Sequence, residues 1–183
     1  MHATLAEKLW SGATTTLIKQ AALVIAGSLL LAASAHVKVP FWPVPMTMQT
    51  LVVLLIGATY GRNLALATVA AYLVEGAAGL PFFSAGGGIA ILAGPTAGYL
   101  FGFLIAAGLV GHLANRGLGR SVASAIPIFI LGDAAIFLCG VAWLSTFVGI
   151  EGAITGGLVP FLLAEVAKIA LACALLPWAW KRA

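Results

Sequence analysis

The sequence predicts an all-α membrane protein with six transmembrane helices, and three observations lead to this prediction. The 183 residues are 62% hydrophobic and only 8% charged, which is too little charge to solvate a globular surface. Apolar segments recur up to the C-terminus, whereas a cleavable signal peptide has one short apolar core. The nine Lys and Arg residues lie singly between these segments, as topology signals do. We therefore expect one integral membrane domain over residues 1–183, with lipid and not nucleic acid around it.

The six expected spans follow from the length of a hydrocarbon core, which takes about 20 apolar residues per helix. We place them at residues 17–35, 47–60, 64–78, 95–113, 121–147 and 160–180. The second span is short for a full crossing unless the proline-rich loop before it also enters the membrane.

The first span carries small residues one helical turn apart. Ala22 and Ala26 form one such pair, and Ser28 and Ala32 form another. Pairs like these let a second helix approach closely. Alanine is so common in this segment that composition alone explains the spacing as well.

Proline marks the start of the second span. Pro40, Pro43 and Pro45 remove amide donors and force extended backbone, so the helix begins after them. Gln49 then lies in the first turns, where a buried amide needs partners. Glu75 ends the third span close to water, which favours an ordinary interfacial acid over a ligand.

The segment 79–99 is the most glycine-rich part of the chain. Gly86, Gly87 and Gly88 would let a ligand approach the backbone closely and contact its amide groups. Irregular backbone at membrane depth must be covered by protein or line a cavity. A flexible outer loop explains the composition equally well.

The last three spans contain the remaining polar groups. Pro95 suits the first turn of the fourth span, where its missing donor costs nothing. The fifth span carries Asp133 and Trp143, and a glycine-rich turn at 149–152 leads into the sixth.

The sixth span contains an acid and a base, Glu165 and Lys168. Burying either in hydrocarbon costs a few kcal/mol, so both should face the protein interior. Their i, i+3 spacing puts them on one helical face. A structural ion pair is the simpler interpretation, and a binding site for a small polar solute is the other.

The depth of these charges favours a pocket. Lys168 lies about 12 Å below the outer face at 1.5 Å per residue. Asp133 lies at the same depth if the core is about 30 Å thick. With Glu165 one turn nearer the surface, the three side chains would form a polar pocket that opens outward beneath the two loops.

The basic residues indicate the orientation. With a cytoplasmic N-terminus, only Lys38 falls on the outer side. The inner side then holds seven: Lys8, Lys19, Arg62, Arg116, Arg120, Lys181 and Arg182. This is a strong positive-inside pattern, so we expect both termini in the cytoplasm.

No motif indicates catalysis or an energy source in this chain. A phosphate-binding GxxxxGK[ST] loop is missing, and so are GxSxG and HExxH. Cys139 and Cys173 fall inside apolar segments and are not spaced as metal ligands. We therefore expect no cofactor or metal and no enzyme, although an intramembrane hydrolase or transferase is the alternative class. ATP hydrolysis would have to occur on another chain.

Four stretches resemble, in the same order, those of the BioY family, the biotin-specific S components of energy-coupling factor (ECF) transporters. They are VPFWPVPMTMQT at 39–50, AGLPFFS at 78–84, GPTAGY at 94–99 and GVAWL at 140–144. The resemblance implies a six-helix protein of the plasma membrane that binds biotin from outside. It also implies a transmembrane T component and a pair of cytoplasmic ATPases as partners.

The resemblance extends to single residues. The family pattern PFLPGDxxK falls on residues 160–168, so Lys168 matches its lysine and Glu165 stands in place of its aspartate. The small-residue motif that the family uses against the T component falls on Ala22 and Ala26. Ser84 lies where the family can carry a biotin-contacting asparagine.

These assignments give an expected binding mode. Glu165 would accept from the ureido N–H groups of biotin, with Lys168 on the ureido oxygen and the biotin carboxylate near Gly86, Gly87 and Gly88. Tyr99 and Trp143 would form an apolar wall, although plain helix packing explains them as well. The alternative function is an oligomeric vitamin facilitator that works without an ATPase.

Overall fold

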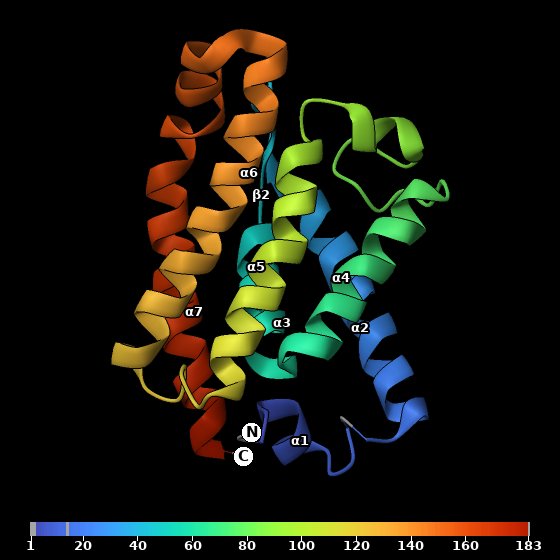
Figure 1. The fold of residues 1–183 in the computed structure, drawn as a ribbon, viewed down its shortest axis with the longest axis vertical. Helices are drawn as coiled ribbons and strands as arrows, with labels where there is room; N and C mark the ends of the chain where they lie inside the picture. The colour runs from blue at the N-terminus through green and yellow to red at the C-terminus, as the bar shows by residue number, and fades with distance from the viewer. Residues whose placement is uncertain (1–2, 14, 183) are drawn as a thin grey trace.

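The structure is a computed structural model that describes residues 3–13 and 15–182. Its elements are, in chain order, α1 (Leu5–Leu9), α2 (Leu17–His36), β1 (Lys38–Val39), β2 (Met46–Thr47), α3 (Gln49–Tyr60), α4 (Arg62–Ala77), η1 (Ile89–Ala93), α5 (Ala97–Asn115), α6 (Val122–Gly157), η2 (Val159–Phe161) and α7 (Leu162–Arg182). The six principal helices α2 to α7 form a bundle along the long axis of the molecule, and all of them except α3 extend over most of its length (Figure 1).

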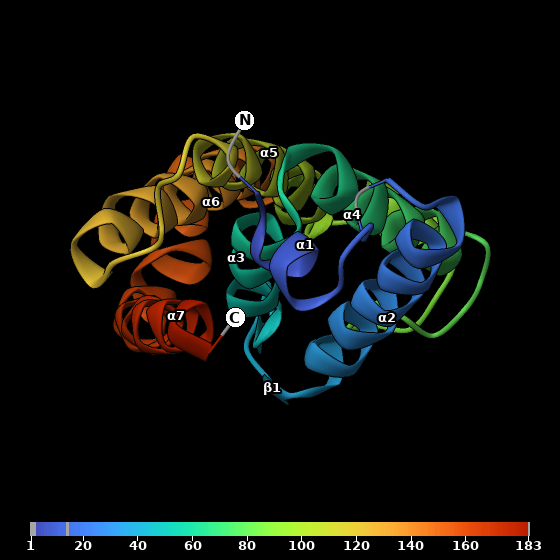
Figure 2. The same ribbon diagram turned by 90° about the horizontal axis from the view of Figure 1, so that it is seen from below.

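The short helix α3 occupies the centre of the bundle. It contacts each of the other five long helices. Figure 2 shows it between α2 and α7, with α4, α5 and α6 curving around its other side. Its 12 residues extend about 18 Å, less than a hydrocarbon core of about 30 Å. The antiparallel hairpin β1–β2, in which Lys38 pairs with Thr47, continues the path of α3.

The helices fit a membrane by length and composition. Residues 17–36, 97–115 and 122–182 are long and apolar enough to cross one, and the last of these ranges contains α6, η2 and α7. The α3 helix is apolar but shorter. An all-helical protein with six principal helices, some of them candidate membrane spans, is thus confirmed.

Two of the observed helix boundaries differ from the expected spans in ways that change the local structure. The second helix begins at Gln49 and not at residue 47, because Thr47 belongs to β2. The α6 helix runs to Gly157, past a kink at Gly149, whose φ of 75° suits glycine. The expected turn therefore lies at that residue, and a further short helical segment follows it. The sequence did not lead us to expect α1, the hairpin or η1.

Glycine sets the close packing of α5 against α6. A Cβ atom added to Gly140 would lie 2.2 Å from the Tyr99 ring, and one added to Gly98 would lie 2.3 Å from the Cβ of Trp143. Neither contact is possible for a larger residue without a shift of the helices. The Gly140 contact fixes the position of the Tyr99 ring in the half of the bundle opposite the termini (Figure 1).

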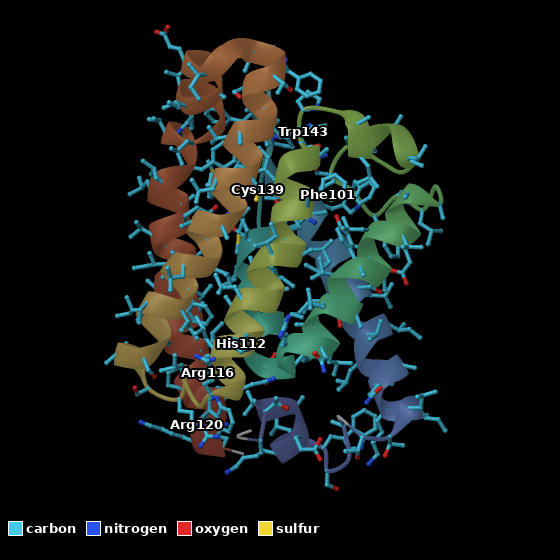
Figure 3. The ribbon with its side chains drawn as sticks, in the orientation of Figure 1. Phe101, His112, Arg116, Arg120, Cys139 and Trp143 are labelled. Atoms are coloured by element: carbon cyan, nitrogen blue, oxygen red, sulfur yellow. The ribbon has the colours of Figure 1, made fainter. Side chains whose placement is uncertain are left out.

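Basic side chains gather at the end that carries both termini. Arg116 and Arg120 lie there (Figure 3), and Arg120 and Lys8 both lie over the Trp180 ring, 4.7 and 5.9 Å from its centroid. At the opposite end, the Lys38 amine donates to the Ser84 carbonyl, and His36 bonds to the Pro81 carbonyl at 2.8 Å. The hairpin and the glycine-rich loop are thereby tied together.

Candidate functional site

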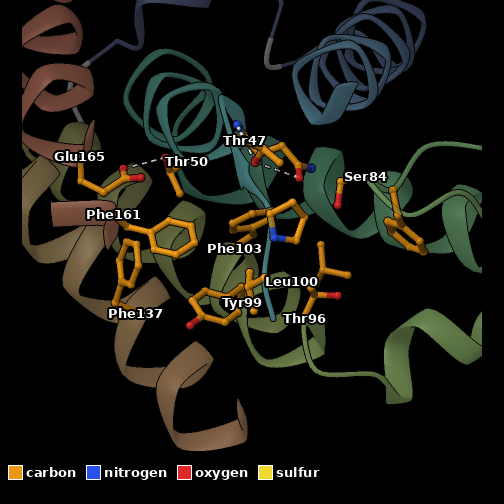
Figure 4. Close-up of a pocket in the computed structure, with 14 residues that line it drawn as sticks. Thr47, Thr50, Ser84, Thr96, Tyr99, Leu100, Phe103, Phe137, Phe161 and Glu165 are labelled. Carbon is orange, nitrogen blue, oxygen red and sulfur yellow. Dashed lines mark hydrogen bonds between the residues drawn. The ribbon is translucent and has the colours of Figure 1, made fainter. Parts of the chain in front are cut away.

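A cavity lies toward the end of the bundle opposite the termini, between the hairpin, the glycine-rich loop and four helices. Its lining residues are Val44, Pro45, Thr47, Gln49, Thr50, Phe83, Ser84, Thr96, Tyr99, Leu100, Phe103, Phe137, Phe161 and Glu165. In Figure 4, Glu165 and Thr50 lie at one end of it and Ser84 lies at the other. Its volume of about 50 Å³ admits a few water molecules.

The Glu165 carboxylate at one end of the cavity is held by two partners. Lys168 Nζ lies 2.6 Å from Glu165 Oε1, and Thr50 Oγ1 donates to Glu165 Oε2 at 2.8 Å. The i, i+3 pair predicted from the sequence is thus formed, with Glu165 3% and Lys168 6% exposed. An ionised carboxylate offers about four acceptor positions, so Glu165 retains capacity for a further donor.

The Lys168 ammonium uses all three of its protons inside the protein. Besides Glu165, its acceptors are the Thr47 carbonyl at 2.6 Å and Thr50 Oγ1 at 3.1 Å. A contact between this ammonium and a ligand would require the exchange of one of these bonds. Lys168 lies behind Glu165 and does not line the cavity. In this position the Lys168 ammonium neutralises the Glu165 carboxylate and fixes its orientation.

Gln49 is a further buried polar residue of the lining. Its Nε2 donates to Tyr72 Oη at 2.6 Å, and Thr47 Oγ1 donates to its Oε1 at 3.4 Å. The Tyr72 hydroxyl then donates to the Phe82 carbonyl at 3.3 Å. The expected partners of the buried amide are therefore present, and they link α3 to α4 and to the glycine-rich loop.

Three aromatic rings form an apolar wall. Phe137 of α6 lies between Tyr99 and Phe161, with ring centroids 5.8 Å from each. Both pairs have the edge-to-face geometry that aromatic rings favour. The Tyr99 hydroxyl donates to the Gly157 carbonyl at 2.7 Å, which connects the wall to the end of α6.

Replacing Tyr99 with phenylalanine is expected to destabilise the protein. The ring would keep its place, but the buried Gly157 carbonyl would lose its donor, at a cost of about 1–3 kcal/mol. A lower thermal midpoint in detergent would show this. Tyr60→Phe is the control, because the half-buried Tyr60 makes no hydrogen bond through its side chain within the described part of the chain. Equal midpoints for the two variants would contradict the prediction.

The glycine-rich loop contributes Ser84 to the lining, whereas its three consecutive glycines stay outside it. The Gly86 amide donates to the Phe83 carbonyl at 2.9 Å, and the Gly88 amide donates to the Gly76 carbonyl at 2.8 Å. These two amides are therefore already engaged. A ligand carboxylate would have to displace an internal bond to use either of them.

Two other expected site residues also lie outside the cavity wall. Trp143 is 39% exposed on the half of α6 that lies away from the termini (Figure 3), and its Nε1 donates to the Gly94 carbonyl at 2.9 Å. Asp133 does not line the cavity, and its buried Oδ1 has no hydrogen-bond partner among the described residues. Of the expected residues, the structure brings Glu165, Gln49, Ser84 and Tyr99 to the wall.

The sequence interpretation missed several lining residues. Thr50 is a polar side chain in the first turn of an apolar helix, next to Gln49, and this placement was a usable signal. Phe137 and Phe161 carried no signal, because aromatic residues in apolar helices mostly pack against neighbouring helices. No three His, Cys, Asp or Glu side chains gather as metal ligands within the residues that the structure describes.

Comparison with known proteins shows the family. The chain matches the BioY family over residues 5–183. It belongs to that family. It is 36% identical over 155 residues to the probable biotin transporter BioY of Pyrococcus horikoshii, which covers 84% of this chain and 91% of the relative. It is 37% identical over 145 residues to the biotin transporter BioY of Thermotoga maritima, in an alignment that covers 78% of this chain and 85% of the relative.

A solved structure shows the same fold as this BioY-family chain. It is the crystal structure of the S-component for biotin from an ECF-type ABC transporter, with a TM-score of 0.77 over 90% of this chain and 92% of the other, at 23% identity. The resemblance stated from the four sequence stretches is confirmed. Membership of a family of transporters also agrees with the expectation that this chain is not an enzyme.

Proposed function

We propose that this BioY-family protein is the S component that captures biotin for uptake across the plasma membrane. The observation that carries the proposal is the buried Glu165 carboxylate at one end of the cavity, fixed by Lys168 and Thr50. The names of its relatives, which are biotin transporters, support biotin as the ligand.

The chemistry of the cavity suits the two ends of biotin differently. Glu165 accepts from the ureido N–H groups, while Lys168 neutralises Glu165 and reaches the ureido oxygen by exchanging one of its bonds. The apolar ring and chain of biotin pack against Phe137, Phe161 and Tyr99, because ligand pockets are mostly lined by apolar side chains between a few polar groups. The biotin carboxylate points toward the glycine-rich loop, where Lys38 supplies a positive charge beside Ser84.

Entry of biotin requires the outer loops to move. A cavity of about 50 Å³ is too small for a bicyclic vitamin, so the hairpin and the glycine-rich loop separate as it enters. Lys38 and His36 hold these two segments together through two hydrogen bonds. Such bonds each contribute about 1 kcal/mol, so the loops open at little cost.

The orientation and the partners complete the proposal. The end that carries both termini and most basic side chains faces the cytoplasm, so the cavity and the loops that cover it lie on the outer side. A T component contacts α2 at Ala22 and Ala26, which are both exposed, whereas Ser28 and Ala32 face the interior. Cytoplasmic ATPases on other chains supply the energy.

Binding of radiolabelled biotin to the purified protein in detergent tests this function. We expect saturable binding that unlabelled biotin displaces and that thiamine, which has no ureido group, does not. Failure to bind biotin would refute the proposal. Copurification distinguishes the two modes of transport. If the protein is an S component, a T component and ATPases should copurify with the tagged protein. The alternative, an oligomeric facilitator, would be purified without partner proteins.

A further inference from the structure

A groove of about 520 Å³ runs along the surface between α4 and α5. Its apolar lining consists of Leu66, Leu104, Ile105 and Leu109, and Gly108 also lines it. Two basic residues complete the lining: Arg62, the first residue of α4, and His112, which lies on α5 toward the end that carries the termini (Figure 3). The groove is therefore basic at one end and apolar along the rest.

Two glycines of α5 shape this groove. A Cβ atom added to Gly111 would lie 2.6 Å from the Arg62 backbone nitrogen, and one added to Gly108 would lie 3.2 Å from the end of the Leu66 side chain. The close approach at Gly111 holds the first residue of α4 beside the residue of α5 that precedes His112. The missing side chain at Gly108 leaves space between the two helices, one turn deeper in the bundle.

The two basic side chains of the groove have no partner in the protein. Within residues 3–13 and 15–182, neither the Arg62 guanidinium nor the His112 ring forms a hydrogen bond or an ion pair. Glu7, an acid at the same end of the molecule, accepts from the Gly12 amide at 2.8 Å and forms no ion pair with Arg62. The five N–H donors of the guanidinium are thus available to an anion.

The start of α4 adds to the positive potential at this end. The N-cap residue Gly61 makes no side-chain hydrogen bond, and the first turn of a helix carries a partial positive charge on its free amides. A phosphate group matches this arrangement, because a guanidinium binds two of its oxygens at once and the imidazole can donate to a third.

We propose that the groove between α4 and α5 binds an anionic phospholipid, with its phosphate on Arg62 and His112 and one acyl chain along the apolar lining. From His112 to Leu104 the groove extends about 12 Å, at 1.5 Å per residue. This length is close to the depth of one leaflet, about 15 Å in a core of about 30 Å. Basic pockets between transmembrane helices bind anionic head groups in this way. In the orientation proposed above, the lipid belongs to the inner leaflet.

The combination of charge and apolar surface favours a lipid over an acidic protein segment. A soluble partner could reach Arg62 at the end of the bundle, but the lining from Leu66 to Leu104 lies at the depth of the acyl chains. The groove takes no lining residue from α2, the helix at which we place the T component. Nor does it share a residue with the cavity that contains Glu165. The lipid site is thus independent of biotin capture.

Native mass spectrometry of the purified protein tests this site with two lipids of identical acyl chains, phosphatidylglycerol and phosphatidylcholine. We expect the protein to retain several times more phosphatidylglycerol. A double variant, Arg62→Gln with His112→Gln, should lower that retention to the level of phosphatidylcholine, because one basic side chain changes the binding of an anionic lipid by about fivefold. Lys181→Gln, which removes an exposed charge at the end of α7, should retain phosphatidylglycerol normally.

A second variant separates the acyl chain from the phosphate. Gly108→Leu keeps both basic residues but fills the groove, and the neighbouring atom belongs to the flexible end of Leu66. Its retention of phosphatidylglycerol should fall as well. Inorganic phosphate at the same concentration should not displace the lipid from the unmodified protein. If Gly108→Leu does not fold, the double variant and the phosphate competition still decide the question.

Four results would overturn the proposal. They are equal retention of the two lipids by the unmodified protein, unchanged retention of phosphatidylglycerol in the double variant, unchanged retention in a folded Gly108→Leu variant, and displacement of the lipid by inorganic phosphate. Loss of copurifying proteins from a double variant that still retains the lipid would instead make the groove a protein contact. Biotin binding should be the same with and without the double substitution. If neither protein bound biotin, the proposed function would fail, and the lipid measurement would still decide the groove.

Discussion

Replacing Lys168 with alanine is expected to abolish biotin binding while the protein still inserts and folds. The ammonium is the centre of the polar cluster, with three bonds that join Glu165, the Thr47 carbonyl and Thr50. Without it, Glu165 would be a buried charge with no cation beside it and would no longer be held in position for the ureido N–H groups. We expect a loss of affinity of at least about 100-fold, or about 2.8 kcal/mol of binding free energy. Radiolabelled biotin binding in detergent measures this loss.

Two companions make the Lys168 result specific. Lys181→Ala removes a lysine at the exposed end of α7, near the C-terminus, and should bind biotin normally. Lys168→Met retains an unbranched side chain without the charge and should also fail to bind. A monodisperse elution profile and normal helicity would show that the variants fold. Near-normal binding by Lys168→Ala would remove this residue from the site.

Enlarging Ala22 and Ala26 to leucine is expected to stop ATP-driven uptake without weakening biotin capture. Both residues are exposed on α2 and lie one turn apart on the same face, where two added leucines would hold a partner helix away. The cavity takes no lining residue from α2, so capture should be unaffected. Uptake by cells that also contain the T component and the ATPases should fall to background.

Ala21→Leu is the matched control for this experiment. Ala21 is also exposed on α2, but it is turned about 100° from Ala22 at 3.6 residues per turn. Its replacement should leave uptake close to normal. Unchanged uptake in the Ala22→Leu, Ala26→Leu double variant would mean that the small-residue spacing reflects composition only. Loss of biotin binding in the double variant would mean that α2 supports the cavity itself.

Part of the site could be read from the sequence because it depends on local spacing. The i, i+3 separation of Glu165 and Lys168 puts them on one face of any helix, and the cost of burying charge indicates that this face turns inward. Gln49 was found for the same reason, as an amide in an apolar helix that needed partners. The structure contains each of these contacts.

Other parts depended on how the helices are rotated and how closely they approach. The same helix that carries Phe137 into the aromatic wall turns Trp143 outward, onto Gly98 and the Gly94 carbonyl. Matching depth placed Asp133 near Lys168, but depth does not show which side chains face a cavity. The engaged amides of Gly86 and Gly88 likewise follow from the path of the loop and not from its composition.

The sequence by itself determined the class of protein, since the cost of burying charge and the gain from burying apolar side chains in lipid are properties of each residue and of its near neighbours in the chain. It also determined the family, through four stretches in a fixed order. Only the tertiary structure decided which groups share a cavity, because Thr50, Phe137 and Glu165 come from three helices whose relative rotation no single segment encodes.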